Sequence, residues 1–386
     1  MNSSILAIQP SATLAIAALA KQLAAQGRPV CDFAAGEPDF DTPTFIKDAA
    51  IVALREGKTK YTPVAGVPRL CEVIAAKLKR DNGLDYTPSQ IVVSCGAKHS
   101  LALVFQTLLN PGDEVIIPAP YWLSYPEMVR IAGGVPVFVT ATPAADFKIT
   151  PADIERAATA RTVALVINSP CNPTGTMYTP AELRAIGETA IRLGLTLISD
   201  EIYEKMVYDG HEQASMAAFS PALYAHTITV NGMSKAYSMT GWRLGYTAAP
   251  QPFIKAMNAL QSHTASAPNT FAQWGGIAAV ERGDDSIREM VAAFDARRRS
   301  MFALMSAIPG VVCPRPTGAF YVFPDISALG LDSITFARRL LESHNVAVVP
   351  GVAFGADACV RLSYACTQET IETGLARFRA FCASLT

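Results

Sequence analysis

Short runs of β-branched and apolar residues alternate with longer stretches of helical periodicity along most of the chain. Five runs predict buried strands, at Ile91–Ser94, Glu114–Pro118, Thr162–Asn168, Leu195–Ser199 and His226–Val230. The intervals between them are long enough for helices, such as one predicted at Pro180–Leu193. Because helices connect strands that run parallel, the pattern predicts an α/β protein with a mostly parallel sheet between helices.

The last quarter of the chain has a different pattern. It predicts a long charged helix at Asp284–Ala307, short strands at Gly318–Phe323 and Cys359–Ser363, and a final helix from Gln368. This mixture is typical of a smaller α+β domain. Within 386 residues we expect an N-terminal arm that is partly in the small domain (1–45), a large domain (46–285) and a C-terminal small domain (286–386).

Charge and cysteine content narrow the possible partners. The formal net charge is −1, and no apolar run is long enough for a membrane helix, so we expect neither a nucleic-acid nor a membrane partner. The eight cysteines show no CxxC pair and no metal-ligand spacing, which predicts no metal site and a reducing compartment. The apolar stretch Ala12–Ala25 contains Lys21 and is interpreted as an amphipathic helix rather than a signal peptide. The expected location is the cytoplasm.

Polar residues gather after four of the predicted strands. Ligands of open parallel sheets bind beyond the carboxyl ends of the strands, so these segments are expected to meet at one site. The segments are Gly96–Lys98, Asn168–Gly175, Asp200–Tyr203 and Asn231–Arg243.

Lys235 and Arg243 follow the last of these strands. A lysine partly removed from water has a lowered pKa, and its neutral amine is a nucleophile that forms Schiff bases with aldehydes. The planar fork of an arginine suits a phosphate. Taken singly, a lysine in this position is more often a surface residue, and an arginine is more often part of a salt bridge.

The other segments supply complementary chemistry. Asp200 at a strand end can keep a ring nitrogen protonated, and Tyr203 and the rigidly held Asn172 can hydrogen-bond a phenolic oxygen. The turn from Ser94 to Lys98 offers backbone N–H groups at a helix start, which suits an anion. A helix cap, a proline-stiffened loop and a weak glycine-rich turn are the structural alternatives for these three segments.

Trp122 and Arg361 complete the candidate set. The flat indole of Trp122 can stack on a ring, although a tryptophan in this position is more often part of the core. Arg361 lies in a predicted strand, and a buried arginine needs an anion such as a substrate carboxylate.

In combination, these motifs resemble the class I aminotransferases of the fold-type-I pyridoxal-phosphate family over essentially the whole chain. The family's order and spacing recur in Ala35–Asp39, Tyr61–Gly66, Pro120–Pro126, Asn168–Gly175, Ser199–Tyr203 and Ser234–Arg243. The resemblance implies a large domain with a seven-stranded, mostly parallel sheet, pyridoxal 5′-phosphate as cofactor, and amino acids and 2-oxo acids as substrates.

The resemblance also implies a role for each matched residue. Lys235 would carry the cofactor as a Schiff base and act as the general base. The other implied cofactor contacts are Asp200 at the pyridine nitrogen, Asn172 and Tyr203 at the phenolic oxygen, Trp122 on the ring, and Gly96, Ala97, Ser234 and Arg243 at the phosphate. Tyr61 would reach the phosphate of a neighbouring subunit, which implies a homodimer with shared sites. Gly36, Asn172 and Arg361 would hold the substrate α-carboxylate.

Within the family, the chain is similar to the bacterial aspartate aminotransferase branch. The resemblance implies that Lys98, Ser11 and Thr13 read the distal carboxylate, so aspartate and 2-oxoglutarate are the expected substrates of a ping-pong reaction. Some members also use prephenate, but Gln9 stands where many relatives have a basic residue. His99 and Cys171 also depart from residues common in relatives. The alternatives are a β-lyase, an aminotransferase for neutral or aromatic amino acids, and a non-catalytic pyridoxal-binding sensor.

Overall fold

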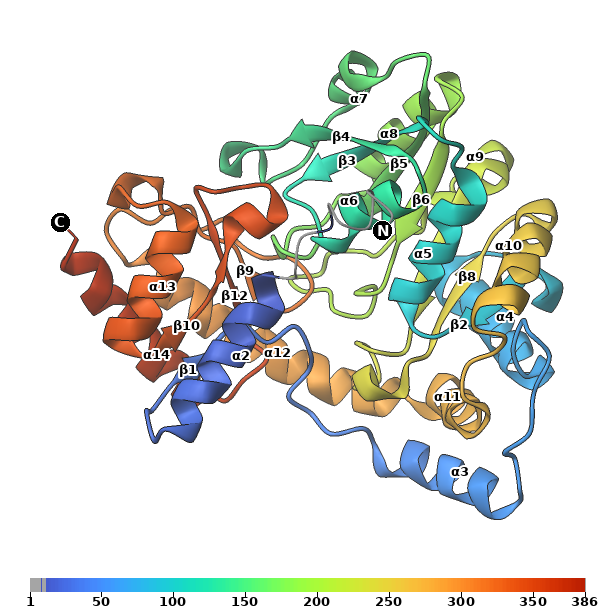
Figure 1. Cartoon of the computed structure of the whole chain (residues 1–386), viewed down its shortest axis with the longest axis horizontal. Coiled ribbons are helices and arrows are strands. Elements are labelled where there is room, and N and C mark those ends of the chain that lie inside the picture. The colour runs from blue at the N-terminus through green and yellow to red at the C-terminus, as the bar shows by residue number, and fades with distance from the viewer. Residues whose placement is uncertain (1–7, 9–11, 386) are drawn as a thin grey trace.

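A seven-stranded sheet forms the centre of the larger part of the molecule (Figure 1). The computed structural model describes residue 8 and residues 12–385. The strand order is β2-β8-β7-β6-β5-β3-β4, and only β8 runs antiparallel to its neighbours. The strands are β2 (Ile91–Ser94), β3 (Glu114–Ala119), β4 (Val135–Thr140), β5 (Thr162–Asn168), β6 (Thr196–Asp200), β7 (Thr227–Gly232) and β8 (Gly245–Ala248).

Both faces of this sheet are buried. On β5, Ala164 and Val166 pack into one apolar cluster, whereas Leu165 and Ile167 pack into another on the opposite face. Alternate side chains of a strand point to opposite faces, so a strand covered on both sides is apolar throughout. The covering helices are α4 (Pro68–Asn82), α5 (Ala97–Leu108), α6 (Ser124–Ile131), α7 (Pro151–Ala157), α8 (Pro180–Arg192), α9 (Pro221–His226), α10 (Gln251–Thr264) and α11 (Thr270–Arg282).

The sheet confirms the predicted α/β class and the five predicted strands, with ends that differ by at most two residues. Two strands were not predicted. The edge strand β4 is partly exposed and contains Pro136, and β8 has the short sequence Gly-Tyr-Thr-Ala, so neither has a strong strand pattern.

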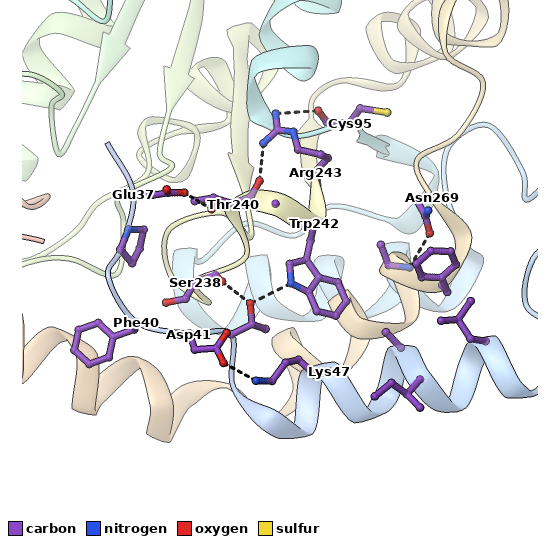
Figure 2. A pocket seen from close by; sticks show the side chains of 18 residues that line it. Glu37, Phe40, Asp41, Lys47, Cys95, Ser238, Thr240, Trp242, Arg243 and Asn269 are labelled. Atoms are coloured by element: carbon purple, nitrogen blue, oxygen red, sulfur yellow. Dashed lines mark hydrogen bonds and ion pairs between the residues drawn. The ribbon is translucent and has the colours of Figure 1, made fainter. Parts of the chain in front are cut away.

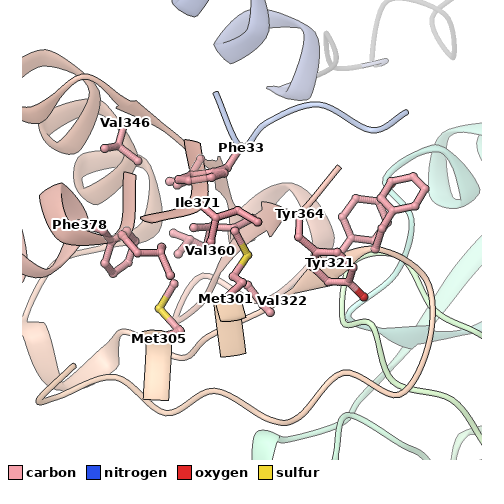
Figure 3. Packing of buried hydrophobic residues seen from close by; sticks show 14 of the residues in the cluster. Phe33, Met301, Met305, Tyr321, Val322, Val346, Val360, Tyr364, Ile371 and Phe378 are labelled. Atoms are coloured by element: carbon pink, nitrogen blue, oxygen red, sulfur yellow. The ribbon is translucent and has the colours of Figure 1, made fainter. Parts of the chain in front are cut away.

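The smaller part of the molecule contains a three-stranded antiparallel sheet and a two-stranded parallel pair. Around them pack α2 (Ala12–Ala25), α13 (Ser333–His344) and α14 (Gln368–Ala383). Figure 3 shows the core that joins these elements, with Phe33, Val360 and Phe378 from distant segments in one cluster. The strands are β1 (Cys31–Asp32), β9 (Tyr321–Val322), β10 (Val346–Ala347), β11 (Val349–Pro350) and β12 (Val360–Ser363).

Helix α12 (Asp284–Ser306) runs between the two parts (Figure 1). Its first turn contributes Ile287 to the core beside β8, whereas Phe294 and Met301 belong to the core of the smaller part. The predicted domain boundary at residue 285 thus falls at the start of a continuous helix. The division into three regions stays a prediction.

Helix α3 (Thr44–Arg55) lies at the margin of the molecule beside α11 (Figure 1). Its outer face exposes Ile51, Val52 and Leu54. Within residues 8 and 12–385, no helix combines the length and apolar character that crossing a membrane requires.

Candidate active site

Eleven of the predicted residues line one cavity of about 470 Å³ at the carboxyl ends of the central strands. They are Gly36, Ala97, Lys98, Trp122, Asn172, Asp200, Tyr203, Ser234, Lys235, Arg243 and Arg361. Gly96 adjoins the cavity through its contact with Arg243. Segments far apart in the sequence therefore meet here, as the strand-end rule for parallel sheets predicts.

Lys235 stands on the loop after β7 and is half-buried. Its Nζ donates a hydrogen bond to the backbone carbonyl of Gly36 at 2.5 Å. Burial lowers the pKa of Lys235 to about 8, because removal from water disfavours the ammonium form. About a tenth of the amine is therefore neutral at about pH 7.

Asp200, the last residue of β6, is buried beneath the cavity. Its Oδ2 accepts a hydrogen bond from the Tyr125 hydroxyl at 2.6 Å, and its Oδ1 accepts one from the Ile202 amide at 3.2 Å. Burial raises the pKa of Asp200 to about 6, and the bond from Tyr125 opposes this rise. A cation placed beside this carboxylate would offset the free-energy cost of burying the carboxylate.

Tyr125 was not assigned a role from the sequence, although it lies in the Pro120–Pro126 motif. It is buried, and its ring packs edge-on against Trp122 with the centroids 5.3 Å apart. Tyr125 thus contacts both the buried carboxylate and the indole that lines the cavity. Identifying it required the fold, because its partner Asp200 lies 75 positions away.

Asn172 is held by a second unassigned residue, Asn168. The side chain of Asn168 accepts a hydrogen bond from the Asn172 amide at 2.9 Å and donates one to the Asp200 carbonyl at 3.0 Å. The turn also packs closely on the smaller sheet, since a Cβ at Gly175 would lie 2.3 Å from the Tyr321 carbonyl oxygen. The predicted rigidity of this turn has a physical basis in these contacts.

Arg361 is buried, with 3% of its surface exposed, yet it has no acidic partner among the described residues. It donates hydrogen bonds to the Asn172 side chain at 3.1 Å and to the Ala34 carbonyl at 2.9 Å, while its Nε has no partner. Its guanidinium lies 4.6 Å from the ring centroid of Tyr321. A buried cation with an unused donor is suited to an incoming carboxylate.

Tyr203 faces Tyr321 from below the cavity. The two hydroxyl oxygens are 2.9 Å apart, and both side chains are buried. Burial raises the pKa of each phenol, so both remain neutral donors. Tyr321 was not assigned from the sequence, because the pattern around it indicated only a strand.

Gly96 and Arg243 form a cradle at the other end of the cavity. Arg243 donates hydrogen bonds to the carbonyls of Thr240 at 2.9 Å and Cys95 at 3.4 Å, as Figure 2 shows. A Cβ on Gly96, which has a φ of +86°, would lie 2.5 Å from the Arg243 guanidinium. Helix α5 begins at Ala97 without a side-chain cap from Gly96, so its first N–H groups remain available to an anion.

Lys98 borders the same cavity from the first turn of α5, with its Nζ 5.1 Å from the Trp122 ring centroid. Partial burial and the neighbouring Arg243 lower the pKa of Lys98. Of the two residues predicted to act with it, Thr13 lies in α2, where its side chain is not described. Ser11 and Gln9 lie outside the described residues.

Tyr61 does not line the cavity of its own chain and is 98% exposed. A second, shallower cavity of about 880 Å³ lies between α3 and the loop that carries Arg243 (Figure 2). It shares Glu37, Thr240 and Arg243 with the first cavity. The cradle is therefore open toward the surface that α3 borders.

Taken together, the doubly covered sheet, the half-buried amine and the buried arginine without an acidic partner define an α/β enzyme with a site for anions. Residues 28–378 match the model of the family aminotransferase class I and II. The chain therefore belongs to this family of aminotransferases.

Individual relatives are similar over almost their whole length. The aspartate aminotransferase of Geobacillus stearothermophilus is 49% identical over 382 residues, which cover 98% of this chain and 97% of that protein. The aspartate/prephenate aminotransferase of Cereibacter sphaeroides is 46% identical over 396 residues, covering 100% and 99%. The structure of the Thermus thermophilus aspartate aminotransferase with maleate superposes with a TM-score of 0.95 at 45% identity, covering 98% of this chain and 99% of that one.

Proposed function

We propose that this enzyme binds pyridoxal 5′-phosphate and transfers the amino group of L-aspartate to 2-oxoglutarate, giving oxaloacetate and L-glutamate with ping-pong kinetics. The observation that carries the proposal is the arrangement of Lys235, Asp200 and Arg361 around one cavity. An amine, a buried carboxylate and an anion-binding arginine are the three groups that amino transfer on this cofactor requires. The names of the relatives support the choice of aspartate.

The residues present fit the cofactor at both of its ends. The free N–H groups at Ala97, together with Ser234 and Arg243, would hold the phosphate, and the carboxylate of Asp200 would hold the pyridine nitrogen protonated. Trp122 would cover the ring, and Asn172 and Tyr203 would hydrogen-bond its phenolic oxygen. When bound, the cofactor supplies an electron-withdrawing ring that stabilises negative charge on the substrate Cα.

The chain's own residues then orient the substrate and move its proton. Arg361 and Asn172 hold the α-carboxylate, which fixes the direction of the Cα–H bond. Lys235, as a neutral amine, would take the Cα proton and would deliver it to the carbon atom bonded to the far side of the transferred nitrogen. The Gly36 carbonyl, which accepts from Nζ at 2.5 Å, keeps this amine beside the carboxylate site.

Lys98 is the residue on which the preference for a dicarboxylate depends. Its cationic Nζ borders the cavity without an ion pair to any described carboxylate, so a distal substrate carboxylate can pair with it. Ser11 and Thr13 stay predictions for the same contact. Two similar proteins carry the name aspartate/prephenate aminotransferase, one of them as a probable assignment, which supports prephenate as an additional acceptor.

The test is a half-reaction with single substrates. The cofactor-loaded enzyme is mixed separately with L-aspartate, L-glutamate, L-alanine and L-phenylalanine, and the change in cofactor absorbance is followed. Fast reaction is expected with the two dicarboxylates only, and Lys98→Gln should lower kcat/KM for aspartate about 10- to 100-fold without lowering the rate with alanine.

Lys148→Gln is the matched control, because Lys148 also lies over an aromatic ring, at 6.0 Å from Tyr178, but outside the cavity. A wild-type preference for alanine or phenylalanine would refute the role of Lys98 and favour a neutral or aromatic substrate. Prephenate is then offered to the aminated enzyme. Its rapid conversion would show that a cation at the position of Gln9 is dispensable.

Cofactor capture by the cofactor-free protein should depend on the protonation of Lys235. Only the neutral amine attacks an aldehyde, and the pKa of Lys235 is lowered to about 8 by burial. The capture rate constant should therefore rise about tenfold per pH unit below that value and level off above it. Stopped-flow absorbance measures it, and a profile without a rise between pH 6 and about pH 8 would contradict the assignment.

We also propose a homodimer with shared sites, in which Tyr61 reaches the phosphate cradle of the second subunit. The nearly complete exposure of Tyr61 and the opening of the cradle beside the apolar face of α3 support it. Tyr61→Phe should leave the dimer intact in sedimentation experiments and weaken cofactor binding about tenfold. A fully active monomer would rule out shared sites.

A further inference from the structure

His99 contacts the cradle without lining the cavity. It stands on the first turn of α5, two residues after Ala97, and it is half-buried. Its Nδ1 accepts a hydrogen bond from the backbone amide of Cys95 at 3.2 Å. The backbone carbonyl of Cys95 accepts a hydrogen bond from the Arg243 guanidinium at 3.4 Å. Both polar backbone groups of Cys95 are thus held by side chains of the cradle region. Figure 2 shows the bond from Arg243 to the Cys95 carbonyl.

The bond between His99 and the Cys95 amide lies just before the first residue of α5. Many helices are capped by a side chain that accepts from an amide of the first turn. Gly96, at the cap position of α5, has no side chain to do so. An ordinary cap would consume an amide that the phosphate needs, whereas His99 binds the amide that precedes the cradle. The amides of Ala97 and Lys98 therefore stay available to an anion, whereas the His99 amide donates to the Gly96 carbonyl at 2.9 Å.

The imidazole can accept at Nδ1 only when that nitrogen carries no proton. Burial lowers the pKa of His99, which favours the neutral ring. Arg243 and Lys98 are the charged side chains of the adjoining cradle.

We propose that His99 is a positioning residue of the phosphate cradle, which holds the Cys95 amide so that Ala97, at the start of α5, presents its N–H group to the phosphate. The inference rests on the proposed function, since the phosphate belongs to the proposed cofactor. Without the acceptor, the Cys95 amide loses its partner, and the turn between β2 and α5 can rotate away from Arg243.

The test compares His99→Leu with His99→Asn. Leucine has a similar size but no acceptor, whereas the Oδ1 atom of asparagine can reach the position of Nδ1. His344→Leu, at the C-terminal end of α13 and half-buried like His99, serves as the control for loss of a histidine. For each dimeric protein, the dissociation constants of pyridoxal phosphate and of inorganic phosphate are measured on the cofactor-free form. The ³¹P NMR shift of the bound phosphate is recorded as well.

His99→Leu should weaken both phosphate ligands about 5- to 20-fold and shift the ³¹P signal, and His99→Asn should restore both to within about threefold of wild type. The KM for aspartate should not change at saturating cofactor. Unchanged binding in His99→Leu would overturn the inference while leaving the proposed function intact, and so would equal losses in both variants. If the wild-type protein bound neither ligand, both the phosphate cradle and the proposed function would be refuted.

Discussion

Lys235→Ala is expected to lower kcat with L-aspartate and 2-oxoglutarate by about 10⁴-fold or more. The substitution removes the amine that attaches the cofactor and moves the Cα proton. Lys235→Arg should be almost as inactive, because a guanidinium keeps the positive charge but does not release its proton near neutral pH. Steady-state turnover measures the loss.

Lys255→Ala, on the exposed face of α10, is the control for the loss of a lysine. The cofactor phosphate should still bind to Lys235→Ala, because the cradle residues are unchanged. Retention of more than about a hundredth of wild-type turnover by this variant would contradict the role of Lys235, since a general base alone contributes at least that factor.

Arg361→Leu should raise KM for L-aspartate by about 10²-fold or more, because it removes the buried partner of the substrate carboxylate. The same substitution should leave the melting temperature of the cofactor-free protein unchanged or higher. Within the part of the chain that the structure describes, Arg361 is buried without an acidic partner, so its removal eliminates the cost of an unpaired charge. Calorimetry on the cofactor-free protein tests this part.

Arg298 provides the matched control, since it is equally buried but pairs with Asp209 and Asp295 at 2.7 and 2.6 Å. Arg298→Leu leaves Asp209 and Asp295 with only their exposed partners Arg315 and Arg299, and it should cost about 1–3 kcal/mol of stability with KM unchanged. If Arg361→Leu also lowered the stability and left KM for L-aspartate unchanged, Arg361 would be a structural residue and the carboxylate site would lie elsewhere.

The sequence predicted which segments meet at one cavity, and it predicted five of the seven strands of the central sheet. Lys235, Asp200 and Arg243 follow apolar strands, and parallel strands bring their carboxyl ends together, so their convergence follows from the pattern. The strand β8 was not predicted because it has only four residues and one of them is Gly245. The missing side chain of Gly245 permits the close approach of Ala97. Close packing of backbone on backbone leaves no apolar pattern to detect.

The residues that support the site were also missed. Tyr125 and Tyr321 act through hydrogen bonds to Asp200 and Tyr203, which lie 75 and 118 positions away from them. No local spacing encodes such a contact, because the pairing depends on which strands become neighbours. His99 was noticed as a departure from relatives, but its bond to the Cys95 amide became visible only in the structure.

The central claim is that Lys235 holds pyridoxal phosphate in this enzyme. It is tested most directly by loading the protein with the cofactor, reducing the lysine–cofactor bond with borohydride and mapping the modified peptide by mass spectrometry. The account predicts one stoichiometric modification, on Lys235, and none in Lys235→Ala. Modification of Lys98 or of surface lysines instead, or none at all, would contradict it.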